Sequence, residues 1–441
     1  MKYLQLVFLP VLIVLSNCQS ECDSKAKRST FLWSVRSPDR TSRGFLFGTI
    51  HVPYTEVWDK VSDRVREAFS YSDTVLLEID LRNDDTVKRL IKCKNLKRKQ
   101  TAATYLHPKL HQRIKDFMEN FRRTLLRCVQ KQDQHRPDSY KMAEDLYENI
   151  AGNWDRKRPE WLLFALYQLC ENFLDRPTTP MLDVFLANKA YEEDKQIHAI
   201  ETAHEQCNPV ASLTQEEIIF AINYTVHYLE YLHHTKKLFQ TDNQRSLSTL
   251  VKDYRCGNLD DRYFERNEYA VNGFHMSEVE KLRAEKIQRH LREDIIAKRN
   301  ERMAHRLHRL LSANPHITIF SAIGTGHFFG NGSILHHLHN PIFSAIGTGH
   351  FFGNGSILHH LHNMGYIIQS VKEDDIIDPP RNYGKTITFN SLWLRDHPSV
   401  SNVTIEVIEV NSSSISLSSL LLLLLSMFYL KDIRLFGDSL Y

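Results

Sequence analysis

One segment of this chain occurs twice, and the repeat limits the folds open to it. Residues 320–340 read FSAIGTGHFFGNGSILHHLHN, and residues 343–363 repeat the same 21 residues. Two copies are too few for a solenoid, which needs about three or more repeats to bury a continuous core. Each copy opens with an apolar run that ends in glycine and closes on a helix-like stretch. We therefore interpret the repeat as one strand-to-helix unit written twice.

The two copies differ in the residues that flank them. His316-Ile-Thr-Ile precedes the first copy and favours a complete strand, whereas Pro341 shortens any strand before the second copy and removes a backbone donor. The second copy has the better exit, because Gly365 is placed to cap a helix that ends at Asn363-Met364, and a strand is expected at 366–371. We expect the first copy to supply the functional site and the other copy to form an inserted loop or helix.

The rest of the chain predicts short strands around a helical middle. Turn residues between two apolar runs predict a hairpin over 31–50. The apolar run at 74–79 predicts a buried strand, and the run at 196–201 is a second short strand candidate. Helical spacing dominates from 84 to 311, where the alternating charges of 276–311 are typical of a solvated helix face. The sequence thus predicts an α/β (α+β) fold with a mixed central sheet and a large helical middle region.

Both ends of the chain carry apolar segments. Residues 1–20 combine Lys2, an apolar run and small polar residues, which is the layout of a secretory signal peptide. Residues 415–430 are uncharged and are followed by basic residues, which favours a single-pass type I transmembrane helix over a lipid-attachment signal. Residues 372–414 would form a juxtamembrane stalk and 431–441 a short cytoplasmic tail. We therefore expect the intervening part to be extracellular at the cell membrane.

Cysteines and glycosylation sequons agree with an extracellular setting. The chain has seven cysteines, and cleavage near Ser20 would remove Cys18 and leave an even number, which in a secreted chain indicates disulfides. Asn-x-Ser/Thr sequons begin at Asn223, Asn331, Asn354, Asn402 and Asn411. The formal net charge of +3 comes without a basic stripe interleaved with aromatic residues, so nucleic acid is not an expected partner.

Three apolar runs end in the same pattern, Gly-Thr-x-His. Gly48-Thr-Ile-His51 lies near the amino terminus, and the two copies contribute Gly324-Thr-Gly-His327 and Gly347-Thr-Gly-His350. Glycine permits a sharp turn, and the histidine then stands at the carboxyl end of a strand, where open α/β sheets bind ligands. Imidazoles from two distant strands can meet there on one divalent metal ion. The plainer interpretation is a set of structural histidines at strand ends.

Two acids extend this candidate site. Glu78 lies in the otherwise apolar run 75–79, where a buried carboxylate is costly unless it meets a metal, a cation or hydrogen-bond donors. Glu201 closes a second apolar run, and Glu205 follows four residues later. Two histidines and a carboxylate leave a metal one open position for water, and a second carboxylate can act as general base. Glu78 and Glu201 are the candidate catalytic residues, and their roles as ligand or base stay open.

Taken together, these residues resemble a known family. The motifs around His51, Glu78, Met181-Leu-Asp183, Ile200-Glu201-Thr and His327 are similar to those of the TraB-domain family, and within it to the TIKI membrane-tethered metalloproteases. The resemblance extends from about Thr30 to Val371 and implies a TraB/erythromycin-esterase-like fold. It also implies a divalent metal ion, Mn²⁺ or Co²⁺ with Zn²⁺ not excluded. The metal ligands would be His51, Glu78 and either His327 or His350.

The resemblance implies an activity as well. TIKI proteins cleave the amino-terminal region of Wnt proteins, so a Wnt protein is the expected substrate and inhibition of Wnt signalling the expected outcome. Two other interpretations stay open: a different metal-dependent hydrolase, such as an esterase, on the same scaffold, and a non-catalytic binding protein of the cell surface. The family pattern has a single late Gly-x-x-His motif, so the duplication leaves the working copy open.

Overall fold

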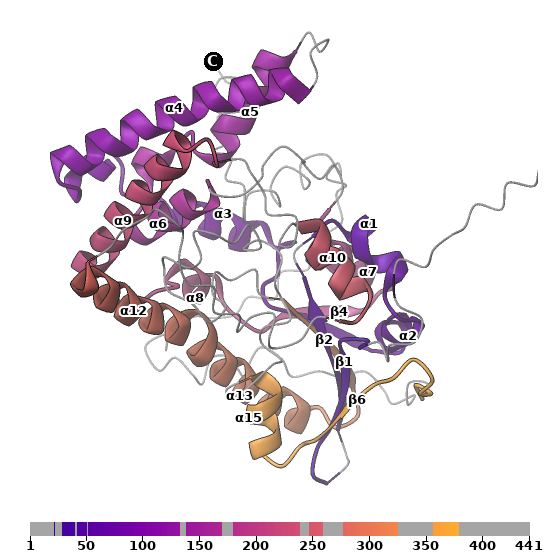
Figure 1. Cartoon of the computed structure of the whole chain (residues 1–441). Helices are drawn as coiled ribbons and strands as arrows, with labels where there is room; N and C mark the ends of the chain where they lie inside the picture. The colour runs from indigo at the N-terminus through magenta and orange to yellow at the C-terminus, as the bar shows by residue number, and fades with distance from the viewer. Residues whose placement is uncertain are drawn as a thin grey trace, which may run out of the picture.

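A six-stranded sheet forms the centre of the molecule (Figure 1). The computed structural model describes residues 22, 29–39, 42–50, 52–132, 138–169, 180–238, 247–258, 277–324 and 356–378. The strands are β1 (Leu32–Arg36), β2 (Arg43–Thr49), β3 (Thr74–Leu77), β4 (Gln196–Ala199), β5 (Thr318–Gly324) and β6 (Ile367–Ser370). Their order is β4-β3-β5-β2-β1-β6, in which β4, β3, β5 and β2 are parallel and β1 is antiparallel to both its neighbours. The expected α/β fold with a mixed central sheet is confirmed.

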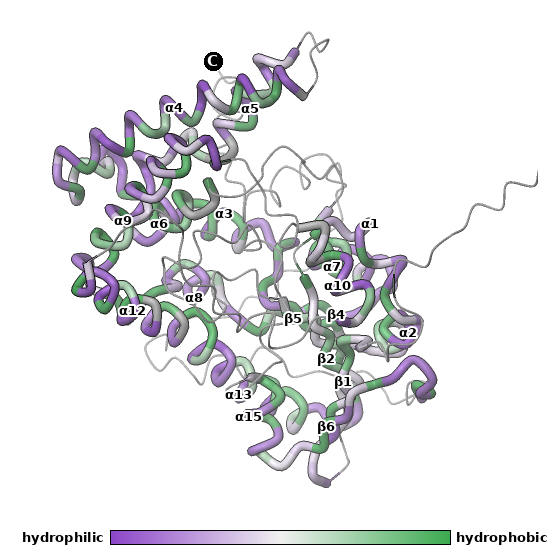
Figure 2. Tube along the Cα trace, in the orientation of Figure 1, coloured by the Kyte–Doolittle hydropathy of each residue, from purple (hydrophilic) through white to green (hydrophobic). Residues whose placement is uncertain are grey.

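Alternation along the strands supplies apolar residues to both faces of the sheet. In β3, Val75 and Leu77 belong to one hydrophobic cluster, and Leu76 belongs to another on the opposite face. Every residue of β3 and β5 is buried, as expected for parallel strands that are covered on both sides. Figure 2 shows hydrophobic residues concentrated in these central strands.

Helices cover both faces and extend into a separate layer. The α-helices are α1 (Tyr54–Val57), α2 (Asp63–Ser70), α3 (Asp84–Cys93), α4 (Pro108–Gln132), α5 (Ser139–Ile150), α6 (Pro159–Gln168), α7 (Leu182–Glu192), α8 (Ala203–Cys207), α9 (Gln215–His234), α10 (Leu247–Arg255), α12 (Glu278–Arg292), α13 (Lys298–Ala313) and α15 (Ile357–Asn363). Helices α1, α2, α7 and α10 pack on one face of the sheet, and α13 and α15 pack on the other. Helices α4, α5, α6, α9 and α12 share their own core, set apart from the sheet in Figure 1.

Two disulfides tie distant parts of the chain together. Cys22 is bonded to Cys256, and Cys93 is bonded to Cys207. Cys128, on α4, is a free thiol. The expectation of disulfides is confirmed for these four cysteines, and Cys170 lies outside the described residues.

The repeat is divided between two elements of the fold. The first copy supplies the last five residues of β5, and the second copy supplies α15. The helical part of the first copy and the strand part of the second lie outside the described residues, so the interpretation of the repeat as one unit written twice stays a prediction. The expected helix cap is confirmed, since Gly365 has a φ of 88°, a conformation that favours glycine.

Several expectations concern parts of the chain that the structure does not describe. Residues 1–20, 415–430 and 431–441 all lie outside the described residues, as do residues 379–414 of the expected stalk. Within the described ranges, no helix combines the length and the apolar character needed to cross a bilayer.

Candidate functional site

The parallel strands end along one edge of the sheet, and two of the predicted acids meet there. Strand β3 lies between β4 and β5, so its carboxyl end is flanked by theirs. Past the last ladder residues, the backbone N–H of Ile200 donates to the carbonyl of Leu77 at 2.8 Å, and that of Glu201 donates to the carbonyl of Glu78 at 2.9 Å. These bonds set Glu78 and Glu201 beside each other immediately after two neighbouring strands.

Helix α13 brings arginines to these acids. We call the group the acid–arginine cluster, and its members are Glu78, Glu201, Glu205, Arg299, Arg302 and Arg306. Nη2 of Arg299 donates to Oε2 of Glu78 at 2.9 Å and to Oε2 of Glu201 at 2.5 Å. Nε of the same guanidinium donates to both carboxylate oxygens of Glu201, at 2.9 and 3.1 Å. Arg299 therefore bridges the two predicted catalytic acids.

Glu201 is the most enclosed acid of the cluster. The residue is 3% exposed, and its carboxylate also accepts hydrogen bonds from Arg302 at 3.1 Å and from Gln206 at 2.7 Å. Burial alone would raise the pKa of Glu201, but the charges and hydrogen bonds of Arg299 and Arg302 outweigh burial and hold this pKa well below its usual range. Glu201 is therefore a stable anion that is poorly suited to accept a proton near neutral pH.

Glu205 shares Arg302 with Glu201, since Nε of Arg302 lies 3.0 Å from its Oε1, and its other partners are structural. Its Oε2 accepts from the backbone N–H of Thr202 at 2.8 Å, which completes the capping box of α8. Arg306 donates hydrogen bonds to both oxygens of the Glu205 carboxylate, at 2.8 and 2.9 Å, and to the carbonyl of Ile200 at 2.7 Å. This pair anchors α8 to α13.

The arginines of the cluster are functional candidates that the sequence interpretation missed. A solvated helix face was expected over 276–311, but Arg299 is 7% exposed and Arg306 is 4% exposed. The spacing i, i+3 and i+7 puts Arg299, Arg302 and Arg306 on one helical face. That face adjoins the buried Met303 and Leu307, so the signal in the sequence was a row of arginines next to an apolar stripe.

The first Gly-Thr-x-His motif is fixed on both sides of its histidine. Tyr254 on α10 donates from its hydroxyl to the carbonyl of Gly48 at 2.6 Å, and the hydroxyl of Thr49 donates to Asp183 on α7 at 3.1 Å. After the histidine, the carbonyl of Val52 accepts from the backbone N–H of Leu182 at 2.9 Å. His51 itself lies outside the described residues. The start of α7 therefore holds the ends of the motif in place.

The two later motif histidines also lie outside the described residues. By sequence, His327 follows the end of β5 by three residues, and His350 precedes the cap residue of α15, Ser356, by six. The structure therefore brings Glu78 and Glu201 together and does not place His51, His327 or His350. Within the ranges that the structure does describe, no three His, Cys, Asp or Glu side chains form a group able to hold a metal ion.

The donor types at this edge fit a divalent metal ion. β3, β5 and β2 are neighbours, and Glu78, His327 and His51 follow their carboxyl ends by one, three and two residues. Two imidazoles and a carboxylate suit zinc, manganese or cobalt. A carboxylate that binds a metal usually accepts a further hydrogen bond that fixes its orientation, and Arg299 supplies such a bond to Glu78.

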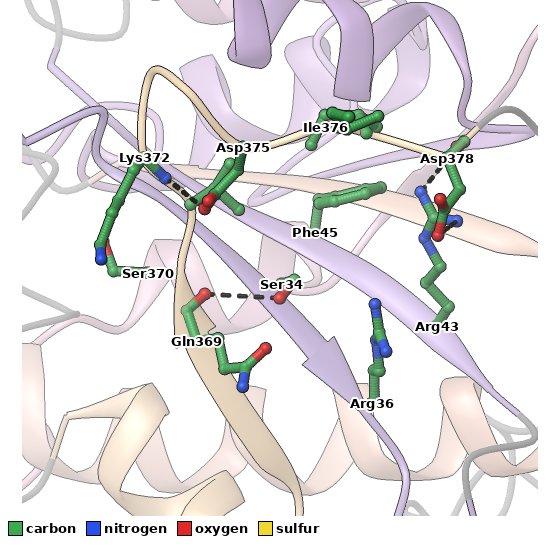
Figure 3. A pocket seen from close by; sticks show the side chains of 12 residues that line it. Ser34, Arg36, Arg43, Phe45, Gln369, Ser370, Lys372, Asp375, Ile376 and Asp378 are labelled. Carbon is green, nitrogen blue, oxygen red and sulfur yellow. Dashed lines mark hydrogen bonds and ion pairs between the residues drawn. The ribbon is translucent and has the colours of Figure 1, made fainter.

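A pocket of about 590 Å³ lies at the other end of the sheet (Figure 3). It is lined by Arg36, Arg43 and Phe45 of the hairpin and by the chain after β6. Arg43 begins β2, whereas the candidate site lies where β2 ends. The Arg43 guanidinium lies 4.9 Å from the Phe45 ring centroid and donates to the carbonyl of Asp378 at 2.9 Å. This pocket is thus separate from the acid–arginine cluster.

Comparison with known proteins identifies the family. The sequence profile of the TraB/PrgY/gumN family matches residues 31–341. "Metalloprotease TIKI2" of Danio rerio is 35% identical over 321 residues, which cover 71% of this chain and 61% of that protein. "Metalloprotease TIKI1" of Homo sapiens is 34% identical over 322 residues (72% and 62%), and "Metalloprotease TIKI homolog" of Nematostella vectensis is 33% identical over 324 residues (71% and 67%).

The matched region spans about three fifths of the length of the Danio rerio and human relatives. No solved structure matches this chain. The family profile nevertheless covers most of the chain, including β1 to β5 and every member of the acid–arginine cluster. The chain therefore belongs to the TraB/PrgY/gumN family.

Proposed function

We propose that this chain is a metal-dependent endopeptidase that cleaves the amino-terminal region of Wnt proteins and so inhibits Wnt signalling. The relatives named as metalloproteases support peptide hydrolysis. The observation that carries the proposal is the pairing of Glu78 with Glu201 at the carboxyl edge of the sheet. The Gly-Thr-x-His motifs that end β2 and β5 lead to the same edge.

Within this proposal the two acids have different roles. Glu201 is held by two arginines and keeps its charge, so its part is to orient Arg299. Glu78 would bind the metal together with His51 and one of His327 and His350. A bound Mn²⁺, Co²⁺ or Zn²⁺ would supply a nucleophilic hydroxide near neutral pH and polarise the scissile carbonyl.

The proposed setting is the outer face of the cell membrane. Residues 1–20 would direct secretion, and residues 415–430 would anchor the chain as a single-pass type I protein. Disulfides agree with this setting, because they persist in oxidising compartments. The catalytic part would then meet an extracellular protein substrate.

The test uses the full-length chain expressed on cultured cells and exposed to a purified Wnt protein. We expect mass spectrometry to show a Wnt protein shortened at its amino terminus, with the shortening lost in a chelator and restored by added Mn²⁺ or Co²⁺. Cleavage of an ester substrate with the Wnt protein intact would select an esterase instead. A Wnt protein that is bound but intact would select a non-catalytic binding protein.

Two histidine variants locate the activity. His51→Ala is expected to abolish cleavage and leave surface expression unchanged, because the proposed metal loses a ligand. The matched control is His305→Ala, which removes an exposed imidazole of α13 and is expected to retain full cleavage. Cleavage by the His51→Ala variant at the rate of the unmodified chain would contradict the site.

A further inference from the structure

We propose that Arg299 is a positioning residue that holds the Glu78 carboxylate in the orientation needed for metal binding, while Glu201 holds Arg299. The inference rests on the proposed function, because it concerns the same site. Arg299 and Glu201 would thus act through Glu78 and would not contact the substrate.

The hydrogen bonds of Arg299 are divided unequally between the two acids. Three of them, at 2.5, 2.9 and 3.1 Å, go to Glu201, and one, at 2.9 Å, goes to Oε2 of Glu78. Arg302 also holds the Glu201 carboxylate, at 3.1 Å. The guanidinium is thus fixed by Glu201 and presents a single donor to Glu78. Such a chain of bonds determines where the Glu78 carboxylate points.

Stability gives little reason to keep these charges inside the protein. The Arg299 and Glu201 side chains are 9% and 1% exposed, and that of Glu78 is 11% exposed. Desolvation of buried ions offsets most of their mutual attraction, and apolar replacements of such groups are often neutral or stabilising. A role in orienting Glu78 as a metal ligand explains the cluster better, because metal-binding carboxylates need partners that fix their orientation.

The helix carries a local irregularity next to Arg299. Residues Glu293–Ala297 form a π-helical turn between α12 and α13, which adds one residue to the regular hydrogen-bonding pattern. Asp294 in this turn is anchored by the backbone N–H and hydroxyl of Ser212, at 2.6 and 2.7 Å, and by Lys298 at 2.8 Å. The turn therefore sets the rotation of α13 and directs Arg299 at the strand-end acids.

The same helix offers a matched control. Arg306 lies two turns further along α13 and pairs with Glu205 at 2.8 and 2.9 Å. It is buried to a similar degree, 4% exposed against 7% for Arg299, and it donates to Glu205 and to the carbonyl of Ile200. Any effect of losing a buried arginine on folding is thus expected in both variants, whereas an effect on Glu78 is expected only at Arg299.

The experiment compares Arg299→Lys and Arg306→Lys in the full-length chain purified in detergent. Lysine keeps the charge but lacks the planar fork that reaches two acids at once. Mn²⁺ affinity is measured by calorimetry, Wnt cleavage is resolved into kcat and KM, and thermal unfolding reports stability. For Arg299→Lys we expect Mn²⁺ affinity and kcat to fall by about 10–100-fold with KM nearly unchanged. For Arg306→Lys we expect both to stay within about 2-fold at a similar loss of thermal stability.

Glu201→Gln is the second variant, and it decides the matter if Arg299→Lys does not fold. This substitution weakens the hydrogen bonds between residue 201 and Arg299 and leaves the Glu78 side chain unchanged. Mn²⁺ affinity is therefore expected to fall by about 10-fold. Unchanged Mn²⁺ affinity in the folded variants, or an equal loss in Arg306→Lys, would overturn the positioning role while the unmodified chain still cleaves. An unmodified chain that neither binds Mn²⁺ nor cleaves the Wnt protein would overturn the proposed function itself.

Discussion

The two copies of the repeated segment have the same sequence, and each contributes a different one of the elements that the structure describes. In the first copy, Phe320–Gly324 forms the end of the central strand β5, and in the second copy, Ile357–Asn363 forms α15 on the face of the sheet. The intrinsic helix and strand propensities of the two copies are the same, because the copies are identical over 21 residues. The two copies can therefore be compared only through their flanking residues and the partners that these flanks reach.

On the strand side, the first copy has a partner that the second cannot bond. The backbone N–H of Thr318 donates to the Asp73 carboxylate at 3.0 Å, and the carbonyl of Thr318 accepts from the Asp73 backbone at 2.9 Å. The equivalent position before the second copy is Pro341, which has no N–H to donate. This contact favours β5 from the first copy.

On the helix side, the advantage lies with the second copy. The backbone N–H of Met364 donates to the carbonyl of Leu361 at 3.1 Å, and Gly365 adopts a positive φ. The Tyr366 hydroxyl then lies 2.9 Å from Nδ1 of His308 on α13. After the first copy these positions hold Pro341, Ile342 and Phe343, which lack the donor, disfavour positive φ and lack the hydroxyl.

The largest expected effect compares the same leucine in the two copies. Leu361 is fully buried between α15 and the sheet, so Leu361→Ala is expected to lower the free energy of unfolding by about 2–4 kcal/mol. Leu338→Ala, the matched change in the first copy, is expected to cost less than about 0.5 kcal/mol. Denaturant unfolding of both variants checks this, and equal losses would show that the copies share the helical role.

A second variant gives the first copy the flank of the second. Thr318→Pro removes the N–H that reaches the Asp73 carboxylate, and a lost hydrogen bond to a charged group costs about 2 kcal/mol. Thr318→Ser keeps the donor and is the control. Denaturant unfolding that finds the proline and serine variants equally stable would remove Asp73 from the explanation of why the first copy forms the strand.

A third variant weakens the cap that favours the second copy. Alanine at Gly365 would have to adopt a φ of 88°, and its Cβ would lie 3.2 Å from Cγ of Pro38. We expect a loss of about 1 kcal/mol in thermal unfolding, with a smaller loss for Gly365→Asn, because asparagine tolerates the left-handed conformation better. A Gly365→Ala variant as stable as the unmodified chain would show that the glycine cap does not stabilise α15.

The smallest expected effect comes from deleting one period, residues 333–355. The deletion leaves β5 and α15 intact and shortens the connection between them from 32 residues to 9. Loop-closure entropy alone favours the shorter connection by about 1 kcal/mol. Thermal unfolding should therefore show a small gain in stability, and a destabilised product would mean that the second period contributes contacts of its own.

The sequence by itself determined the local elements and the types of residue at the site. Apolar runs and the turn residues between them predicted the hairpin over 31–50 and the strands at 74–79 and 196–201. Glu78 and Glu201 stood out as acids in apolar runs, and the structure sets them side by side. The roles of His51, His327 and His350 stay predictions.

Only the tertiary structure decided the partners of these residues. Arg299 lies 221 positions from Glu78 and 98 from Glu201, and its place beside an apolar stripe does not name the acids that it meets. Likewise, Cys93 pairs with Cys207 across 114 residues, and Asp73 accepts from the backbone N–H of Thr318 just before the first copy. Sequence periodicity indicates which face of its own element a side chain lies on, whereas the packing of distant elements determines which residues it contacts.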